Sequence, residues 1–191
     1  IVFGDWSSDV CSSDLCLKSK RLWRYTTDAT EWYLYCNNGD SFPGLLHALY
    51  TLHREYEFTA VMNVGIAGSL DDTLPIGSIH AVSSVLYHDL QTGRTFLPVK
   101  QCNSLLPCAK PLITVPMVTE GYKQEWRYFG TLLDMEGFFV AQWGEKNAVP
   151  VYLFKQVSDY NHDVRASVDV TITKDLYAYF CKPNKDWEEF F

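Results

Sequence analysis

Two carboxylic acids in the last third of the chain, Glu136 and Asp159, have the chemistry and spacing to hold a small polar ligand. Glu136 lies in an acidic turn that opens a predicted helix, and Asp159 follows a predicted buried strand. Carboxylates bind vicinal hydroxyls well, because a charged acceptor forms the stronger hydrogen bond. For either acid alone a structural explanation is favoured: Glu136 suits a helix N-terminus through the helix dipole, and Asp159 caps the next segment.

The segment 132–159 predicts how the two acids are positioned. It reads as a strand tip at Leu132, a turn at Asp134, Met135 and Glu136, a helix through Asn147 and a strand over 151–157. A parallel pair of strands joined by a helix brings both strand ends to one edge of the sheet, where ligands bind in open α/β sheets. We therefore expect the two acids to lie near one another, one towards a sugar and the other towards a base.

The remaining elements follow from apolar periodicity and from turn residues. We expect strands over 32–36, 59–64, 79–86 and 112–115, and helices over 41–55, 123–129 and 173–181. Gly65 and Gly68 predict a tight turn that brings backbone close to a ligand, and Pro98 and Pro107 predict loop over 91–111. Alternating strands and helices predict a three-layer α/β/α fold with a mostly parallel or mixed central sheet.

Length and composition limit the class of protein. The 191 residues suit a single domain, and 47% apolar with 20% charged residues describe an ordinary soluble globule. A net charge of −7 without a Lys or Arg stripe argues against a nucleic-acid partner. No apolar run reaches the ~18 residues that span a membrane. Six dispersed cysteines and five dispersed histidines predict a cytoplasmic protein with reduced cysteines, no metal and no cofactor.

Residues 1–25 form an atypical start. Residues 7–14 read SSDVCSSD, which has neither helical nor strand periodicity and resembles the translation of a sequencing adapter. Two interpretations remain open: roughly the first fifteen residues are foreign to the natural protein, or they form a genuine loop rich in Ser and Asp.

Several stretches, in order, resemble the nucleoside phosphorylase and nucleosidase family, closest to the methylthioadenosine/S-adenosylhomocysteine nucleosidases and the futalosine hydrolases. They are VMNVGIAGSL at 61–70, the turn LPIGS that follows, YHD at 87–89, LLDMEGFFVAQ at 132–142 and FKQVSD at 154–159. The resemblance is specific because three motifs occur in order at this spacing. They are N-x-G-x-A-G, then D-M-E-G, then S-D at the end of a strand. The resemblance covers roughly residues 32–163 and implies a nucleoside phosphorylase-like domain.

The resemblance also implies roles for individual residues. Met135 and Glu136 contact the ribose, with Glu136 on the 2′ and 3′ hydroxyls, and Asp159 protonates the purine N7 as the glycosidic bond breaks. Lys155 stands where the family often has Arg, and it keeps the charge without the bidentate fork. The implied substrate contacts are Met135, Glu136, Ala67, Gly68, Ser158, Phe96 and Lys155.

Phe96 corresponds to an aromatic residue that reaches into the partner subunit's pocket, so the resemblance implies a homodimer. The family's first strand, whose tip carries a Glu that activates water, has no visible counterpart before Trp32. The expected function is hydrolysis of a 5′-modified purine ribonucleoside of the methylthioadenosine, S-adenosylhomocysteine or aminodeoxyfutalosine type. The alternatives are a purine nucleoside phosphorylase, which needs a cationic phosphate pocket that Arg94 and Arg127 do not suggest, and a catalytically silent nucleoside-binding protein.

Overall fold

The computed structural model describes residues 2–4, 22–26, 31–36, 42–103, 108–116 and 124–160, with the backbone alone at 2–4, 23, 25, 26, 32, 36, 42, 96–99, 124 and 125. The strands and helices of these residues are β1 (Val2–Gly4), β2 (Leu22–Thr26), β3 (Glu31–Cys36), α1 (Phe42–Tyr56), β4 (Val61–Ser69), β5 (Ile79–Asp89), β6 (Arg94–Gln101), β7 (Lys110–Thr114), the 3₁₀ helix η1 (Gln124–Tyr128), β8 (Leu132–Asp134), α2 (Gly137–Asn147) and β9 (Val151–Tyr160).

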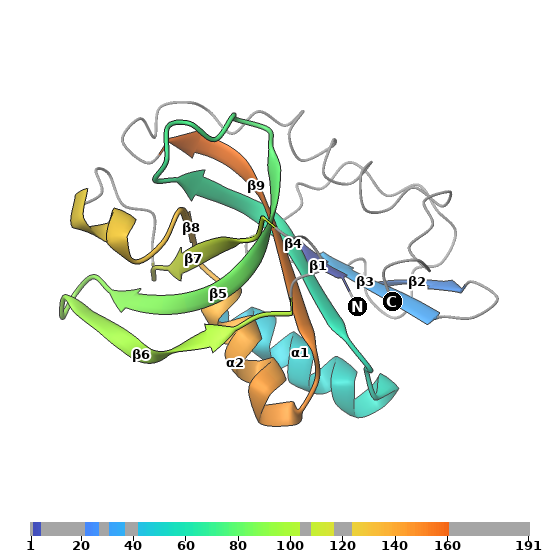
Figure 1. Ribbon diagram of the computed structural model, residues 1–191. Coiled ribbons are helices and arrows are strands. Elements are labelled where there is room, and N and C mark those ends of the chain that lie inside the picture. The colour runs from blue at the N-terminus through green and yellow to red at the C-terminus, as the bar shows by residue number, and fades with distance from the viewer. Residues whose placement is uncertain are drawn as a thin grey trace.

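The strands form one mixed, nine-stranded sheet in the order β2-β3-β1-β4-β8-β7-β5-β6, with β9 paired to both β4 and β5. The sheet therefore curls until β4, β8, β7, β5 and β9 form a closed ring of paired strands (Figure 1). The long strand β5 makes this closure possible, because its first residues pair antiparallel with β9 and its later residues pair parallel with β7. The predicted mixed sheet is confirmed, and its partial closure was not predicted.

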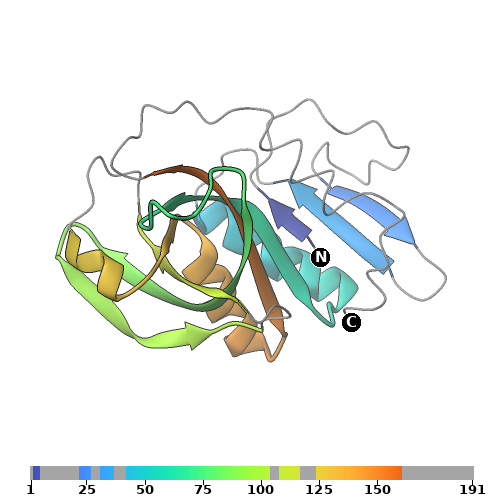
Figure 2. The same cartoon turned by 45° about the horizontal axis from the view of Figure 1, so that its top comes forward.

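The helices α1 and α2 lie side by side below the sheet in Figure 1, and Figure 2 shows them together from another angle. Leu45, Leu49 and Leu52 form the buried face of α1, as their helical spacing predicts, and Trp143 of α2 is 1% exposed in the same core. Apart from η1, these two are the helices of the described residues. The expected helix over 173–181 lies outside them, so the three-layer arrangement stays a prediction.

The direction of β8 differs from the prediction for the segment 132–159, which was expected to form two parallel strands joined by a helix. β8 runs antiparallel to β4, whereas β9 runs parallel to β4, so β8 and β9 run in opposite directions on either side of β4. The prediction of a parallel pair was therefore wrong. A three-residue strand is too short for its pairing partner to be read from apolar periodicity.

Two further predictions about local structure were wrong. Gly65 and Gly68 form no turn, because β4 continues through them to Ser69 between two partner strands. The predicted loop over 91–111 contains β6, which runs through Pro98. Pro98 is tolerated because β6 lies at the edge of the sheet and pairs with β5 alone, with an irregular register opposite Val85 and Tyr87.

Strands also occur before Trp32, where none was predicted. β1 lies between β3 and β4 and pairs parallel with both, through Val2 with Leu34 and Met62. β2 pairs antiparallel with β3 at the end of the sheet. The segment 5–21, which contains the repeated SSD, lies outside the described residues, so both interpretations of it stay open.

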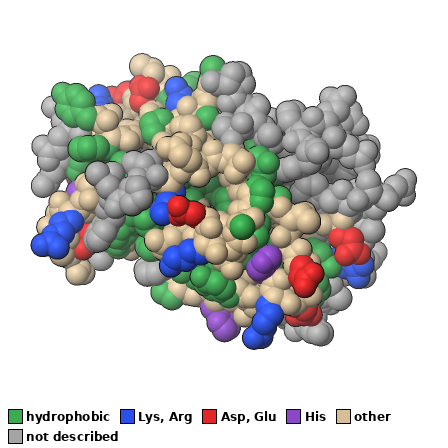
Figure 3. Space-filling model, turned by 60° about the horizontal axis from the view of Figure 1, so that its bottom comes forward, with side chains coloured by type: hydrophobic (Ala, Val, Ile, Leu, Met, Phe, Trp, Pro, Cys, Tyr) green, Lys and Arg blue, Asp and Glu red, His purple; other side chains and the backbone are tan. Residues whose placement is uncertain are grey.

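The surface carries charges of both signs. Figure 3 shows one face of the molecule, on which the coloured Lys and Arg side chains are interspersed with Asp and Glu rather than gathered by sign. Within the described part of the chain, neither α-helix has the length and apolar character needed to cross a bilayer.

Candidate active site

The end of β4 brings four of the predicted site residues together, namely Ala67, Gly68, Ser158 and Asp159. Gly68 pairs with Leu133 of β8 on one side and with Asp159 of β9 on the other. Met135 and Glu136 come directly after β8, which runs antiparallel to β4, so the chain there runs back along β4 on the flank opposite Asp159. The segments that carry Glu136 and Asp159 thus share the neighbour strand β4 rather than forming a parallel pair, and the proximity of the two acids stays a prediction.

A β-bulge shapes the Asp159 side of the site. Ala67 pairs with Val157 and Gly68 pairs with Asp159, so Ser158 is the extra residue that is skipped in the register. Bulges bend a strand and redirect its side chains, and they are common next to active sites. Val157 is fully buried, whereas Asp159 just beyond the bulge is half-buried. The bulge therefore separates the core-packing part of β9 from the part that can meet a ligand.

Ser158 orients the Asp159 carboxylate. Its hydroxyl lies 2.6 Å from Asp159 Oδ2 and 3.3 Å from the Ala67 carbonyl oxygen. A hydroxyl has one proton to donate, and the shorter contact is the one to the carboxylate. Ser158, Asp159, Ala67 and Gly68 thus form one connected group at the end of β4.

The turn at 74–78, which contains the LPIGS motif, anchors β9 on the side away from β4. The Gly77 N–H donates to Val157 O at 2.8 Å, and the Val157 N–H donates to Ser78 O at 3.0 Å. The Gln156 side-chain amide donates to Gly77 O at 2.9 Å. Gly77 has φ 86°, a conformation that strains a residue with a side chain. The end of β9 is therefore held from both sides.

The turn before α2 shows how Glu136 is placed. Glu136 occupies the N-cap position of α2 with φ −129°, yet its side chain makes no capping hydrogen bond. Asp134 Oδ2 accepts the Gly137 N–H at 2.8 Å, and Thr114 Oγ1 accepts the Phe138 N–H at 2.8 Å. The first N–H groups of the helix are thus satisfied by other residues, so the Glu136 side chain does not cap the helix, and the helix-dipole explanation for Glu136 stays a prediction.

Lys155 reaches this turn across β4. Its ammonium lies 2.8 Å from Asp134 Oδ2, and the two side chains are 2% and 1% exposed. Lys155 is the register partner of Gly65 in β4, and a Cβ on Gly65 would lie 3.3 Å from Lys155 Nζ. The N-x-G part of the motif therefore leaves room for the lysine to pass. The role of Lys155 in substrate binding stays a prediction.

Sequence reasoning did not assign functions to Asp134 and Thr114. Thr114 is fully buried, and its hydroxyl donates to Asp134 Oδ1 at 2.6 Å. A signal was present, because a polar residue ends a short apolar strand at Thr114 and an acid ends another at Asp134. Their partnership depends on the parallel pairing of β7 with β8, which no local pattern indicates.

The aromatic residues near the site pack with one another. Tyr87 has its ring centroid 5.7 Å from that of Phe138 and 5.2 Å from that of Phe139. This agrees with the interpretation of the two phenylalanines as packing residues. Phe96 pairs with Tyr87 through its backbone on the edge strand β6, which is not adjacent to β4. The role of Phe96 in substrate binding and across a dimer stays a prediction.

Comparisons with known proteins bear on the fold. Neither the family descriptions nor the curated proteins contain a match to the chain. Solved structures do match. One is a variant of an MTAN from Chlamydia trachomatis bound to MTA, at 18% identity and a TM-score of 0.70, over 92% of this chain and 88% of that chain.

Two further structures extend the comparison. A 5′-methylthioadenosine/S-adenosylhomocysteine nucleosidase from Colwellia psychrerythraea in complex with adenine has 16% identity and a TM-score of 0.68, over 90% of this chain and 87% of that one. A futalosine hydrolase mutant from Helicobacter pylori has 14% identity and a TM-score of 0.66, over 93% and 97%.

The chain therefore has the nucleosidase fold. More particularly, its fold is that of the methylthioadenosine/S-adenosylhomocysteine nucleosidases and of a futalosine hydrolase. The resemblance noted in the sequence is confirmed at this level. The substrate, the homodimer, the cytoplasmic location and the roles of the site residues stay predictions.

Proposed function

We propose that the protein hydrolyses the N-glycosidic bond of a 5′-modified purine ribonucleoside of the methylthioadenosine, S-adenosylhomocysteine or aminodeoxyfutalosine type. The observation that carries the proposal is the pairing of Gly68 with Leu133 on one side and Asp159 on the other. Neighbouring strands lie about 4.8 Å apart, so the two flanking backbones are roughly 10 Å apart. That span suits a nucleoside with its ribose towards Glu136 and its base towards Asp159.

The chemistry follows from where charge develops. As the bond from C1′ to the base nitrogen breaks, positive charge builds on the sugar and negative charge on the base. Asp159 gives its proton to N7 of the base, water adds to C1′, and the proton that the water loses restores Asp159. A positioned general acid typically contributes ~10²- to 10⁴-fold. Glu136 accepts hydrogen bonds from the 2′ and 3′ hydroxyls and offsets the positive charge on the sugar.

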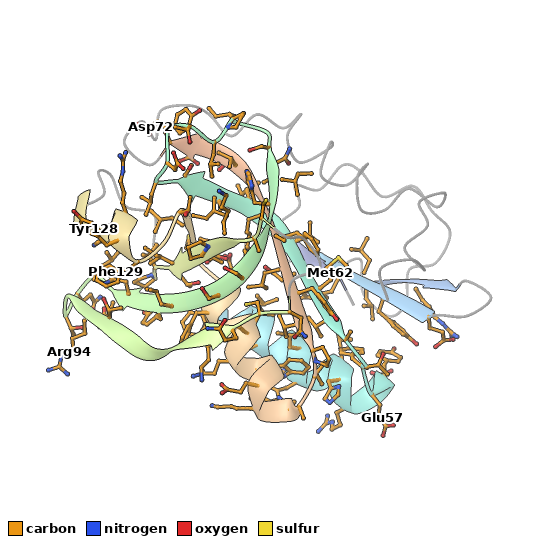
Figure 4. The ribbon with its side chains drawn as sticks, viewed as in Figure 1. Glu57, Met62, Asp72, Arg94, Tyr128 and Phe129 are labelled. Atoms are coloured by element: carbon orange, nitrogen blue, oxygen red, sulfur yellow. The ribbon has the colours of Figure 1, made fainter. Side chains whose placement is uncertain are left out.

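Three of the described cations, Arg94, Arg127 and Lys155, give no support to phosphorolysis. Phosphate capture needs converging cationic donors. Arg94 lies at the tip of the β5–β6 hairpin and points away from the body of the molecule (Figure 4). Arg127 lies 3.4 Å from Asp72, and Lys155 faces Asp134. These three cations therefore do not form a phosphate pocket together.

The test is to incubate the protein with the three nucleosides, with and without inorganic phosphate, and to follow the free base and the sugar product by chromatography. We expect free adenine and an unphosphorylated 5-substituted ribose at a rate that is independent of phosphate. Asp159→Asn should lower kcat by roughly 10²- to 10⁴-fold. Asp72→Asn, the same substitution at an exposed position, should leave kcat unchanged.

Three results would contradict the proposal. Acceleration by phosphate with release of ribose 1-phosphate would assign the protein to the phosphorylases. Calorimetric binding of an adenosine analogue without turnover would make it a nucleoside-binding protein. An Asp159→Asn variant as active as Asp72→Asn would remove Asp159 from the chemistry.

A further inference from the structure

Asp134 stands outside the substrate contacts that the resemblance implies, yet it is the most heavily bonded acid of the site. Its Oδ1 accepts the Thr114 hydroxyl at 2.6 Å. Its Oδ2 accepts the Gly137 N–H at 2.8 Å and faces the Lys155 ammonium at 2.8 Å. The Asp134 side chain is 1% exposed. Both oxygens are thus occupied by protein groups, and the carboxylate is too deep to meet a ligand directly.

These contacts fix the backbone on both sides of Glu136. The Asp134 carbonyl oxygen accepts the Val115 N–H at 2.9 Å, which ties the residue before the turn to the end of β7. The carboxylate of the same residue holds the Gly137 N–H, which ties the residue after the turn. A Cβ on Gly137 would lie 2.9 Å from Asp134 Oδ2, so the close approach depends on glycine. Met135 and Glu136 are therefore held in a short arc fixed at both ends.

Because of the same contacts, the Glu136 side chain is not needed to cap the helix α2. The first N–H groups of a helix have no partners within the helix, and the side chain at the N-cap usually accepts one of them. In this chain Asp134 and Thr114 accept the N–H groups of Gly137 and Phe138, while the Glu136 side chain makes no capping bond. Lys155 offsets the charge that Asp134 carries into the interior, where an unpaired carboxylate is strongly unfavourable.

We infer that Asp134 is a positioning residue that aims Glu136 at the ribose, and that the preference for a ribonucleoside over its 2′-deoxy counterpart depends on it. The inference rests on the proposed function, because it needs Glu136 to accept a hydrogen bond from the 2′ hydroxyl. Thr114 acts through Asp134 in the same way, since its hydroxyl donates to the carboxylate and accepts the Phe138 N–H. Neither residue touches the substrate.

The test compares kcat/KM for methylthioadenosine with kcat/KM for 2′-deoxymethylthioadenosine. The wild type should prefer the ribonucleoside, and Asp134→Asn should reduce that preference roughly tenfold, the scale of one misplaced hydrogen bond to a charged group. Thr114→Val should reduce it as well, whereas Thr114→Ser, which keeps the hydroxyl, should restore it. A role confined to stability would lower the active fraction for both substrates and leave the ratio unchanged.

Amide hydrogen exchange gives a second readout that needs no substrate. The Gly137 and Phe138 amides should exchange faster in Thr114→Val than in Thr114→Ser, because the capping arrangement is lost. An unchanged substrate ratio in both Asp134→Asn and Thr114→Val, with an active wild type, would overturn the inference alone. A wild type that releases base from neither nucleoside would refute the proposed function, and the inference would fall with it.

Discussion

Replacing Lys155 with Met tests how much the buried ion pair between Lys155 and Asp134 contributes to the free energy of unfolding. The two charged groups are 2.8 Å apart and their side chains are 2% and 1% exposed, so solvent screens them little. Breaking a buried pair from one side costs about 3–5 kcal/mol, because the remaining charge loses its partner. A chain of this size loses about 2–4 °C of Tm per kcal/mol. Lys155→Met should therefore lower Tm by roughly 6–20 °C.

Lys100→Met is the matched control. Lys100 pairs with Glu145, and the two side chains are 14% and 60% exposed, so solvent reaches this pair through Glu145 and we expect it to contribute about 1 kcal/mol or less. Urea unfolding gives the free energy of unfolding of each variant. The two values are compared directly if the m values of the variants are equal.

A double-mutant cycle with Asp134→Asn then separates the pair from other losses at Lys155. We expect a coupling energy above about 1 kcal/mol, within the range for residues in contact. The reasoning is refuted if Lys155→Met destabilises the protein no more than Lys100→Met, or if Asp134→Asn costs the same with and without Lys155.

Two further predictions concern titration and reactivity. Burial lowers the pKa of His80, and the positive charge of Lys110 lowers it further. Because the unfolded ring titrates near pH ~6.5, the stability held by neutral His80 is present above that pH and is lost as pH falls through the lower folded pKa. Urea unfolding at several pH values should show this loss flattened in His80→Gln and unchanged in His47→Gln, an exposed histidine; equal slopes in both variants would contradict it. Burial raises the pKa of Cys102 to about 12, whereas Cys108 is exposed. Iodoacetamide at pH 8 with peptide mapping should therefore label Cys108 well before Cys102, and equal labelling of the two would contradict the buried position of Cys102.

The sequence indicated the long regular elements because each carries its own pattern. The helical spacing of Leu45, Leu49 and Leu52 predicts α1, and the structure has that helix with the three residues buried. The continuous apolar run after Pro150 predicts β9. These patterns arise from which side of an element meets the core, so they are local and readable.

The direction of β8 and the closure of the ring depend on pairing between distant segments. Leu132 pairs with Ser69 and with Leu112, and neither partner is close in sequence. The glycines of β4 misled the prediction for a similar reason. Gly65 suggested a turn, but its missing side chain leaves room for Lys155 from the neighbouring strand. A glycine that leaves room for a neighbour and a glycine that bends the chain look the same in one sequence.

The two acids of the D-M-E turn, Asp134 and Glu136, meet two different structural requirements that a single acid cannot meet. An acid that caps a helix and anchors a turn must have both oxygens held by protein donors, and it is best buried beside a cation, as Asp134 is with Lys155. An acid that binds a ribose must offer its oxygens to the ligand. Glu136 lies at the N-cap position without a side-chain capping bond, because Asp134 and Thr114 accept the first N–H groups of the helix. The buried acid therefore supports the proposed ligand-binding role of its neighbour, although its own carboxylate is enclosed by protein.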